Sequence, residues 1–351
     1  MRGLILTGLM LPSIAGAASF YLDQRTFGDS AAIPAAVLTE GWDVPRSAGT
    51  LSQAFNWSEA GFRQGRWSMG LLYRHDAIVR YDEQTLALMQ HAKRRDPLEP
   101  GQEYNLDFRV DRLEAVGLRL ARRFSPAPRW TVGVGASLLQ ATYLTRGHLK
   151  GRATAVGEKD YDFHFDVDYH YSQDYLFNRQ VTAPEGWGYS FDLNLRWQPR
   201  PGVDLRLRAV DVLSRINWPL APHTQASGDS TVKQYDDQGY VEFVPIMSGR
   251  ETTEALSYRL PPRGTFTAEF GEGRRRLLAQ WFATPDRLYP RLGFRLQRSA
   301  GEVGLLYTLT TGTLSARYAT RHWHVGIGLD ALSPRRLHNA YLLAGFSLPV
   351  S

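Results

Sequence analysis

The sequence contains no cysteine among its 351 residues, so a disulfide framework, a thiol nucleophile and a lipid-modified cysteine are excluded. Beyond the N-terminus it has no apolar run that approaches the roughly 20 residues needed by a membrane-spanning helix. The charge is almost balanced, with 41 Lys and Arg against 35 Asp and Glu. An excess of +6, interspersed along the chain, gives no reason to expect nucleic-acid binding.

The first residues have the composition of an export signal. Arg2 precedes an apolar stretch from Leu4 to Ile14, and the small residues Ala15-Gly16-Ala17 follow. This order predicts a signal peptide over residues 1–17 and export from the cytoplasm. A buried N-terminal helix is the alternative interpretation.

Most of the chain alternates between apolar and polar residues. In WGYSFDLNLRW, Trp187 to Trp197, every second residue is aromatic or aliphatic and the others are small or polar. A period of two predicts a β-strand with one apolar and one wet face. Similar stripes recur almost to the C-terminus, and we count about fourteen strands, within a range of 12–16.

The placement of aromatic residues favours a barrel in a membrane. Aromatic residues make up 12% of the chain, and many of them stand at the ends of stripes, as Trp187 and Trp197 do. Two such girdles are typical of a transmembrane antiparallel β-barrel in the outer membrane. Its partners would then be the lipid bilayer, lipopolysaccharide and the barrel-insertion machinery. A soluble β-sandwich or propeller is the alternative, and it would need a protein surface against each apolar stripe.

The connections between the stripes have two lengths. Three are tight and rich in proline, and they are Ser125 to Arg129, Gln198 to Gly202 and Pro261 to Gly264. Three are long inserts, at about 82–103, 148–186 and 219–252. Outer-membrane barrels have short periplasmic turns and long outer loops, so we place the inserts outside. However, if fourteen strands are counted from Leu51 and both chain ends are periplasmic, the long inserts fall on the periplasmic side. Either a strand is therefore missing from the count, or the orientation is reversed.

The first insert predicts a short helix. Gln84 to Arg95 contains no Gly or Pro, and Asp82 is a suitable N-cap. Its end is basic, through His91, Lys93 and neighbouring arginines. Solvated cations at the negative end of a helix explain this, and docking of lipid phosphates is the alternative.

The second insert contains the most suggestive cluster of polar residues. In YDFHFDVDYHY, Asp166, Asp168 and His170 share one strand face. They could bind a metal or pair an acid with a base. We favour a strand that continues above the membrane with a wet face. The chain has no G-x-S-x-G motif, and we expect no catalytic residue, no cofactor and no resident metal.

Charged residues fall on the wet faces of several predicted strands, where they would line the lumen of a barrel. They are Asp192, Arg196, Asp204, Arg206, Arg208, Arg295 and Arg317. One explanation is a ladder of opposite charges that stiffens a filled barrel. The other is a basic stripe along a path for anionic solutes.

Two short segments resemble the FadL superfamily of outer-membrane transporters of long-chain fatty acids. Ile33-Pro34-Ala35 stands where these proteins have Asn-Pro-Ala, and VDVLSRINW, Val210 to Trp218, is similar to a strand-end signature of uncharacterised members. The resemblance implies a plug-like segment at 18–49, with Ile33, Pro34 and Ala35 as plug or gate, followed by the barrel at 50–351. No ligand-binding residue can be transferred.

The function expected from these observations is passive transport of a small or amphipathic solute, hydrophobic or anionic. The alternative is a non-transporting surface scaffold that binds a partner through its long loops. An outer-membrane hydrolase that uses Asp166, Asp168 and His170 ranks last, so we do not expect an enzyme.

Overall fold

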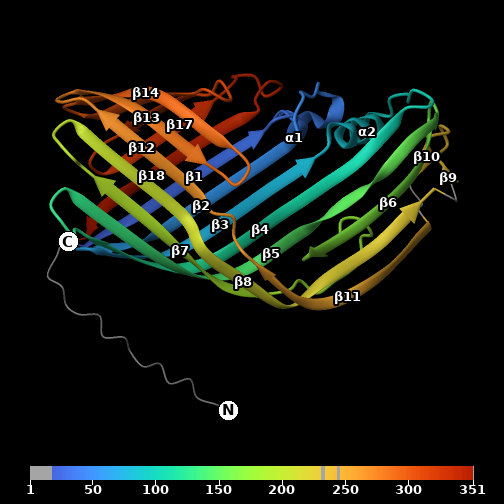
Figure 1. Ribbon diagram of the computed structural model, residues 1–351, viewed down its shortest axis with the longest axis horizontal. Helices are drawn as coiled ribbons and strands as arrows, with labels where there is room; N and C mark the ends of the chain where they lie inside the picture. Colours follow the sequence, from blue (N-terminus) through green and yellow to red (C-terminus); the bar gives the residue numbers. More distant parts are fainter. Residues whose placement is uncertain (1–17, 231–233, 243–245, 351) are drawn as a thin grey trace, which may run out of the picture.

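The computed structural model describes residues 18–230, 234–242 and 246–350, which form a closed antiparallel β-barrel (Figure 1). The predicted signal peptide, 1–17, lies outside the described residues. Fourteen strand positions make up the wall, which confirms the predicted fold class. The wall strands are β1 (Ala18–Ser30), β2 (Leu51–Gln64), β3 (Trp67–Tyr81), β4 (Glu103–Phe124), β5 (Trp130–Gly157), β7 (Gly186–Trp197), β8 (Val203–Asp229), β12 (Arg263–Phe270), β13 (Arg275–Ala283), β14 (Leu288–Arg298), β15 (Gly301–Thr308), β16 (Leu314–Ala319), β17 (Trp323–Leu329) and β18 (Asn339–Val350). The ring closes where β18 pairs with β1.

Two further strands extend one side of the wall, which brings the sheet to 16 strands. β6 (Asp160–Tyr171) pairs with β5 and β8 beyond the end of β7, and β11 (Ile246–Tyr258) pairs with β8 beyond the end of β12. We call this part, formed by β6, β11 and the adjoining ends of β4, β5 and β8, the outer extension. The short hairpin of β9 (Gln234–Tyr235) and β10 (Val241–Glu242) lies at its tip.

The helices are short and lie at the same end of the barrel as the outer extension (Figure 1). They are α1 (Val37–Glu40), a 3₁₀ turn at Gly41–Asp43, and α2 (Glu83–Arg94). Asp82 caps α2 by accepting a hydrogen bond of 2.8 Å from the Gln84 N–H, as the sequence predicted. No helix among the described residues is long and apolar enough to cross a membrane.

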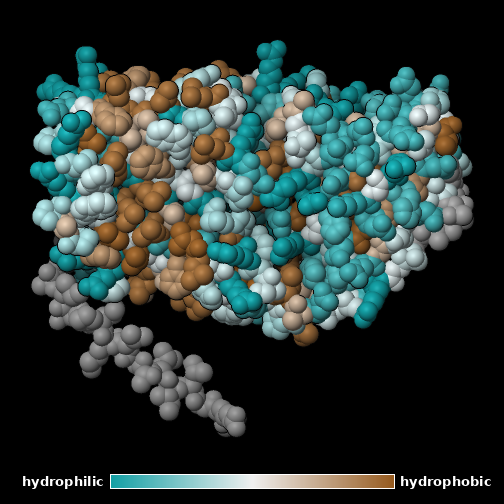
Figure 2. Space-filling view, in the orientation of Figure 1, coloured by the Kyte–Doolittle hydropathy of each residue, from teal (hydrophilic) through white to brown (hydrophobic). Residues whose placement is uncertain are grey.

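An apolar belt covers the outward face of the barrel at the end that carries the termini. Each of the fourteen wall strands contributes at least one exposed large apolar side chain to it, and examples from neighbouring strands are Leu22, Phe62, Leu71, Leu118, Leu138, Trp187, Leu213, Phe266, Leu277, Leu292, Tyr307, Leu314, Ile327 and Leu342. Figure 2 shows brown side chains gathered over this part and mostly polar ones over the outer extension. Trp130 and Trp197 stack on the belt's edge with ring centroids 5.2 Å apart. Such a surface is stable against acyl chains, and it makes this a transmembrane barrel of outer-membrane type.

The prediction of a plug-like segment over 18–49 is wrong for its first 13 residues. Ala18–Ser30 forms β1, which is a wall strand paired with both β18 and β2. The sequence hides this strand because its outward face turns polar after Leu22, so no apolar stripe marks it. β1 is also the strand missing from the count, and with it the long connections lie at the end of the barrel opposite to both ends of the described chain. This agrees with the short-turn and long-loop ends of outer-membrane barrels, and the outward orientation of the long connections stays a prediction.

The structure places Ile33, Pro34 and Ala35 in the loop between β1 and α1. The Ala35 N–H donates to the Leu337 carbonyl at 2.8 Å, which ties this loop to the β17–β18 connection. Ile33 packs beside Tyr81 of β3 and Leu86 of α2, and Tyr81 has the same parity along β3 as the exposed Leu71 and Tyr73. Ile33 therefore packs on the outward side of the wall and not in the lumen, and the role of the three residues as a gate stays a prediction.

The tight connections divide into two kinds. Ser125 to Arg129 and Gln198 to Gly202 are turns between neighbouring strands, as predicted. Pro261 to Gly264 was predicted as a third turn, and this is wrong. β11 and β12 run in the same direction along β8, and residues 259–262 are a break within one wall position. Proline lacks the N–H that a ladder requires, which explains why pairing stops there.

Candidate functional site

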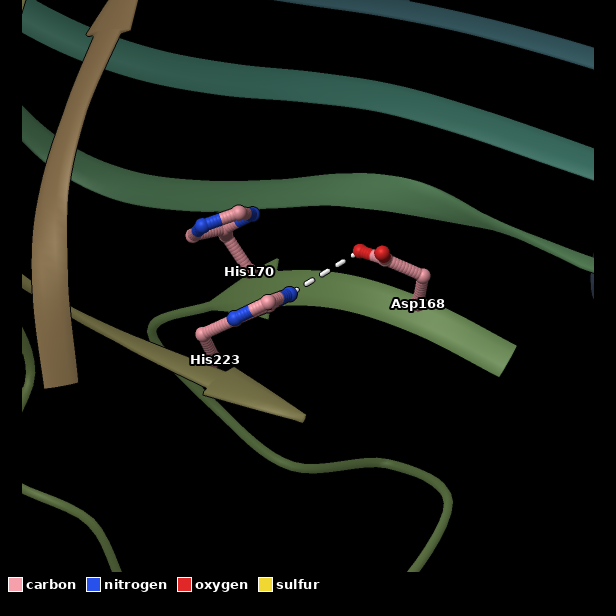
Figure 3. A group of neighbouring side chains, drawn as sticks. All are labelled: Asp168, His170 and His223. Atoms are coloured by element: carbon pink, nitrogen blue, oxygen red, sulfur yellow. Dashed lines mark hydrogen bonds and ion pairs between the residues drawn. The ribbon is translucent and has the colours of Figure 1, made fainter. Parts of the chain in front are cut away.

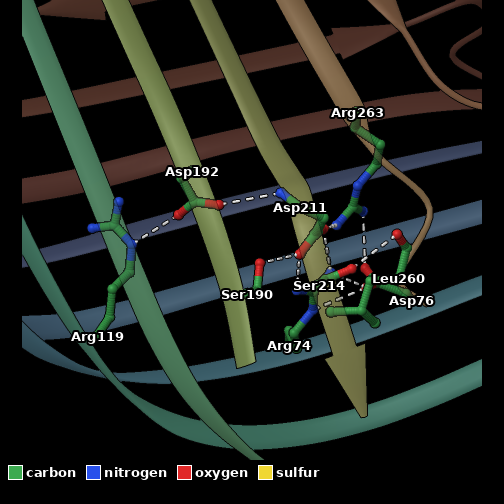
Figure 4. A network of polar contacts seen from close by, with 9 residues as sticks. All are labelled: Arg74, Asp76, Arg119, Ser190, Asp192, Asp211, Ser214, Leu260 and Arg263. Carbon is green, nitrogen blue, oxygen red and sulfur yellow. Dashed lines mark hydrogen bonds and ion pairs between the residues drawn. The ribbon is translucent and has the colours of Figure 1, made fainter. Parts of the chain in front are cut away.

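A layer of charged side chains crosses the lumen. The Arg74 guanidinium on β3 donates to both carboxylate oxygens of Asp211 on β8, at 2.7 and 2.8 Å (Figure 4). Arg263 on β12 donates to Asp211 at 3.3 Å and to Asp76 at 2.9 Å. Arg74 and Asp211 are 1% and 0% exposed, so both charges are removed from water. We call these residues, with Arg119, Asp192 and Glu59, the charged layer.

An irregularity in β8 directs Asp211 into the lumen. Between two register points β8 advances four residues, Ala209 to Leu213, while β7 advances two. Asp211 absorbs this bulge with a φ of +60°, a conformation that Asp tolerates better than most residues. The Ser190 hydroxyl donates to its carboxylate at 2.6 Å and holds it in place.

The second branch of the charged layer joins three further strands. Arg119 on β4 donates to Asp192 on β7 at 3.0 Å and to Glu59 on β2 at 3.3 Å. Asp192 in turn accepts from the backbone N–H of Asp211 at 3.3 Å, which links the two branches (Figure 4). Three guanidinium groups thus face four carboxylates in one buried network. Breaking a pair by removing one partner leaves an uncompensated charge and is strongly destabilising.

An apolar cluster fills the lumen beside this layer. Trp218 and Ile216 of β8 are fully buried in it, and the Arg74 guanidinium lies 5.8 Å from the Trp57 ring centroid. Gly186 makes room for Trp218, because a Cβ at Gly186 would lie 2.4 Å from the indole ring. Asp211, Ile216 and Trp218 all belong to the segment that resembles the FadL-type signature, which therefore fills the lumen.

A chamber of about 940 Å³ lies in the lumen between the charged layer and the terminal end of the barrel. Its lining includes Gly65 and Ser125 from the tight turns and Arg119 and Arg263 from the charged layer. The aromatic rings that line it are Phe27, Phe55, Trp57, Trp67, Phe282 and Tyr341, and the arginines are Arg25, Arg63, Arg66, Arg119, Arg122, Arg123, Arg196, Arg206, Arg208, Arg263, Arg291 and Arg317. The chamber is therefore both basic and aromatic.

Some of the predicted luminal charges neutralise one another. Asp204 pairs with Arg196 at 2.5 Å and with Arg206 at 2.8 Å. Arg295 pairs with Glu269 and, at 2.9 Å, with Glu302. Asp192 belongs to the charged layer. These residues form the ladder of opposite charges that the sequence analysis offered as one explanation.

Other chamber arginines have no carboxylate partner. Within the described ranges, Arg208, Arg291 and Arg317 form no ion pair, although Arg208 and Arg317 were predicted as luminal charges and Arg291 was not. Arg208 lies 5.8 Å from the Trp57 centroid, and Arg291 lies 5.6 Å from that of Phe282. Arg291 is only 7% exposed, and its Nε has no hydrogen-bond partner. These cations are available to an anionic group in the chamber.

A second polar cluster lies on the inward face of the outer extension (Figure 3). Asp168 and His170 come from β6, as the sequence placed them, and His223 comes from β8. His223 Nε2 lies 2.9 Å from Asp168 Oδ1, and the two imidazole rings stack at 4.1 Å. Glu254 of β11 lies 2.9 Å from His170 Nε2 and 3.2 Å from His223 Nδ1. We call these four residues the His–carboxylate cluster. Asp166 is not part of it and accepts from Ser227.

Burial and hydrogen bonds shift the ionisation of this cluster in predictable directions. Burial lowers the pKa of His170, and this outweighs the opposite effect of Glu254. Burial raises the pKa of Asp168, but hydrogen bonds from Gln225 and His223 outweigh it, so that the pKa falls below its ordinary value. At neutral pH the cluster therefore presents an ionised Asp168 and a neutral His170 imidazole.

The apolar face of β6 is covered, which explains its alternating aromatic residues. Tyr161, Phe163, Phe165 and Tyr169 pack in a cluster with Leu88 of α2. This agrees with the prediction of a strand that continues above the membrane with one wet face. His223 and Glu254 were missed because neither belongs to a motif, and only strand pairing brings them to Asp168 and His170.

No protein-family model matches the chain, and no curated protein is detectably similar to it in sequence. Among solved structures, the chain is similar to the monoaromatic hydrocarbon channel TodX in a deletion mutant, with 10% identity, 96% of this chain and 91% of that chain covered, and a TM-score of 0.45. It is also similar to the Pseudomonas putida toluene transporter TodX (10% identity, 95% and 88% covered, TM-score 0.41) and to the Ralstonia pickettii toluene transporter TbuX (6% identity, 96% and 90% covered, TM-score 0.34). All three likenesses have TM-scores below 0.5 and identities of 10% or less, so no function is transferred from them.

Proposed function

We propose that this outer-membrane barrel passively transports small amphipathic solutes that carry an anionic group. The observation that carries the proposal is the luminal chamber, in which Arg208, Arg291 and Arg317 lack carboxylate partners and two of them lie against aromatic rings. A carboxylate or similar anion would pair with the guanidinium groups, while an apolar body would contact the rings. A solute of this kind satisfies both halves of the lining.

The charged layer would act as the closure of this path. Its side chains lie across the lumen, so a solute that passes between the chamber and the outer extension must displace them. Arg74 and Asp211 come from wall strands that are not neighbours, and rotation of their side chains would open the contact without unfolding the wall. The remaining parts of the proposal are an export signal at 1–17, a surrounding of lipid and lipopolysaccharide, insertion by the barrel-assembly machinery, and no catalytic activity.

The test compares uptake of an aromatic anion and a neutral aromatic by proteoliposomes. We expect the protein to admit benzoate faster than benzyl alcohol, and we expect Arg208→Gln combined with Arg291→Gln to reduce that preference at least severalfold. Arg298→Gln is the matched control, because Arg298 is exposed and does not line the chamber. An unchanged preference in the double variant would overturn the assignment of an anionic solute. If neither the wild type nor an Arg74→Ala/Asp211→Ala variant takes up either solute, the proposal of transport is overturned.

A surface scaffold is the second candidate, and the outer extension favours it. β6, β11 and the β9–β10 hairpin project beyond the apolar belt and present polar side chains (Figures 1 and 2). Solute uptake by the wild type, and by a variant in which residues 231–245 are replaced by a short Gly–Ser linker, separates the two candidates. Transport predicts unchanged solute uptake in this variant, whereas a scaffold without transport predicts no uptake in either protein.

A further inference from the structure

The His–carboxylate cluster has the composition of a metal site. We propose that Asp168, His170 and His223 bind a divalent transition-metal cation of the zinc class on the inward face of the outer extension. One ligand atom from each of the three residues lies within 4.8 Å of the others. Two imidazole nitrogens and a carboxylate oxygen are donors that Zn²⁺ and its neighbours in the first transition row bind well.

The hydrogen bonds of the cluster already assign the ring nitrogens. Glu254 Oε1 is the partner of His170 Nε2 at 2.9 Å and of His223 Nδ1 at 3.2 Å. The nitrogens left over are Nδ1 of His170 and Nε2 of His223, and the latter is directed at Asp168 (Figure 3). Glu254 would therefore accept an N–H from each imidazole while the opposite nitrogens bind the cation. This is the usual arrangement in which an outer carboxylate orients metal-bound histidines.

Both nitrogens of His223 face carboxylates, Asp168 at 2.9 Å and Glu254 at 3.2 Å. A neutral imidazole carries a single N–H and can donate to only one of them. A cation between His223 Nε2 and Asp168 would satisfy both contacts of a neutral ring, because both atoms then act as ligands and Nδ1–H donates to Glu254.

Binding of a cation requires the side chains to reorient. Tetrahedral zinc with bonds of about 2.0–2.1 Å places neighbouring ligand atoms roughly 3.3–3.4 Å apart, whereas one ligand atom from each residue now lies within 4.8 Å of the others. The two imidazole rings stack 8° from parallel with their centroids 4.1 Å apart, so at least one ring must rotate out of the stack before lone pairs of both rings can meet at one cation. Gln225 Nε2 donates to Asp168 Oδ2 at 2.9 Å and leaves Oδ1 for the cation. Asp168 is 38% exposed in its side chain, which gives an ion access from solvent.

The experiment measures Zn²⁺ binding by the full-length protein in detergent, without a histidine tag and after removal of metal by chelation. We expect one Zn²⁺ per chain by calorimetry, and X-ray absorption that shows imidazole and oxygen ligands. Asp168→Asn combined with His223→Gln removes two of the three ligands and should weaken binding by more than about 100-fold, beyond the range that outer partners give. Glu254→Gln, which retains all three ligands, should weaken it less, by roughly 10-fold within the 10–100-fold range of such outer partners.

The matched control is Asp166→Asn combined with His164→Gln, because these residues lie on the same face of the same strand outside the cluster, and it should bind Zn²⁺ as the wild type does. Heat-modifiable migration in gels confirms that each variant is folded, and His170→Gln provides a second test if the double variant is not. The proposal is overturned if the wild type binds no Zn²⁺ at micromolar concentrations, or if folded variants of Asp168, His170 and His223 bind it as tightly as the control.

Discussion

Arg74 and Asp211 form a bidentate ion pair across the lumen, although β4, β5 and β7 separate their strands in the wall. A contact of this kind joins two distant parts of the wall through the lumen. Side chains of the wall strands fill this part of the lumen, so no inserted N-terminal segment is needed to fill it.

We expect Arg74→Ala to open the lumen and to destabilise the barrel. Removal of the guanidinium leaves Asp211 and Asp76 with Arg263 as their one remaining arginine partner in the charged layer, and an uncompensated buried charge costs about 3–5 kcal/mol. Single-channel conductance should rise, and the temperature of unfolding in heat-modifiability gels should fall. Arg74→Ala with Asp211→Ala should recover part of the lost stability while it keeps the higher conductance.

The control for this pair is Arg335→Ala. Arg335 pairs with Glu40 at the same distance of 2.7 Å, but its side chain is 67% exposed. An exposed pair contributes about 0–1 kcal/mol, so stability and conductance should change little. If Arg74→Ala behaves like Arg335→Ala, the charged layer neither closes nor stabilises the lumen.

The connection between β6 and β7, residues 172–185, should loosen in acid through Asp174. This buried carboxylate accepts from the backbone N–H groups of Leu176 and Phe177, from the Tyr169 hydroxyl and from Arg179. Burial raises its pKa, but the hydrogen bonds from Phe177, Tyr169 and Arg179 outweigh this and lower the pKa below its ordinary value. A lowered pKa in the folded state means that the stabilisation is fully present above the ordinary carboxyl pKa and is lost as pH falls through the folded value.

The measurement is limited proteolysis of residues 172–185 between pH 7 and pH 3. Cleavage should be slow at pH 7, accelerate below about pH 4, and be fast at both pH values in Asp174→Asn. Asp237→Asn, at an exposed position in the β9–β10 turn, should leave the profile unchanged. A profile of Asp174→Asn that still follows pH as the wild type does would show that another group holds this segment.

The sequence predicts the barrel well because lipid imposes a simple pattern. Stripes such as Met69, Leu71 and Tyr73 alternate strictly, since one face must be apolar for the bilayer and the other polar for the lumen. The same pattern finds Arg196 and Arg206 as luminal residues. It fails for β1, whose outward Gln24 and Thr26 break the stripe, and for Pro261, which reads as a turn but interrupts a wall position.

The pairing of distant residues could not be predicted in the same way. Asp211 lies in a segment that was singled out for its resemblance, yet the bulge that turns its side chain inward is set by the register of β8 against β7. His223 and Glu254 are isolated in sequence, and a register change in β8 between Trp218 and Ala221 decides which face His223 occupies. Local patterns specify faces, but bulges decide where a face changes.

Gly186→Val should destabilise the lumen through Trp218. The added side chain would start with a Cβ 2.4 Å from the indole ring, and Trp218 is fully buried. Overpacking of this kind costs about 1–3 kcal/mol. The checks are the temperature of unfolding and the tryptophan fluorescence spectrum. Gly28→Val is the control, because no atom lies within 4 Å of a Cβ at Gly28, and equal loss of stability in both variants would contradict the role given to Gly186.

The closure of the barrel by β1 can be tested with a disulfide, because the natural chain has no cysteine to interfere. Gly28 on β1 and Ala340 on β18 are direct partners, and directly opposite residues in an antiparallel pair approach closely enough for an S–S bond. Gly28→Cys with Ala340→Cys should cross-link on mild oxidation, and the linked peptides should be found by mass spectrometry. Gly28→Cys with Ser58→Cys is the matched control, because Ser58 lies on the neighbouring strand β2 but opposite Gln24, four residues out of register. Cross-linking in both variants, or in neither, would mean that residues 18–30 do not hold the wall position between β18 and β2. The strand count without β1 would then place the long connections on the periplasmic side.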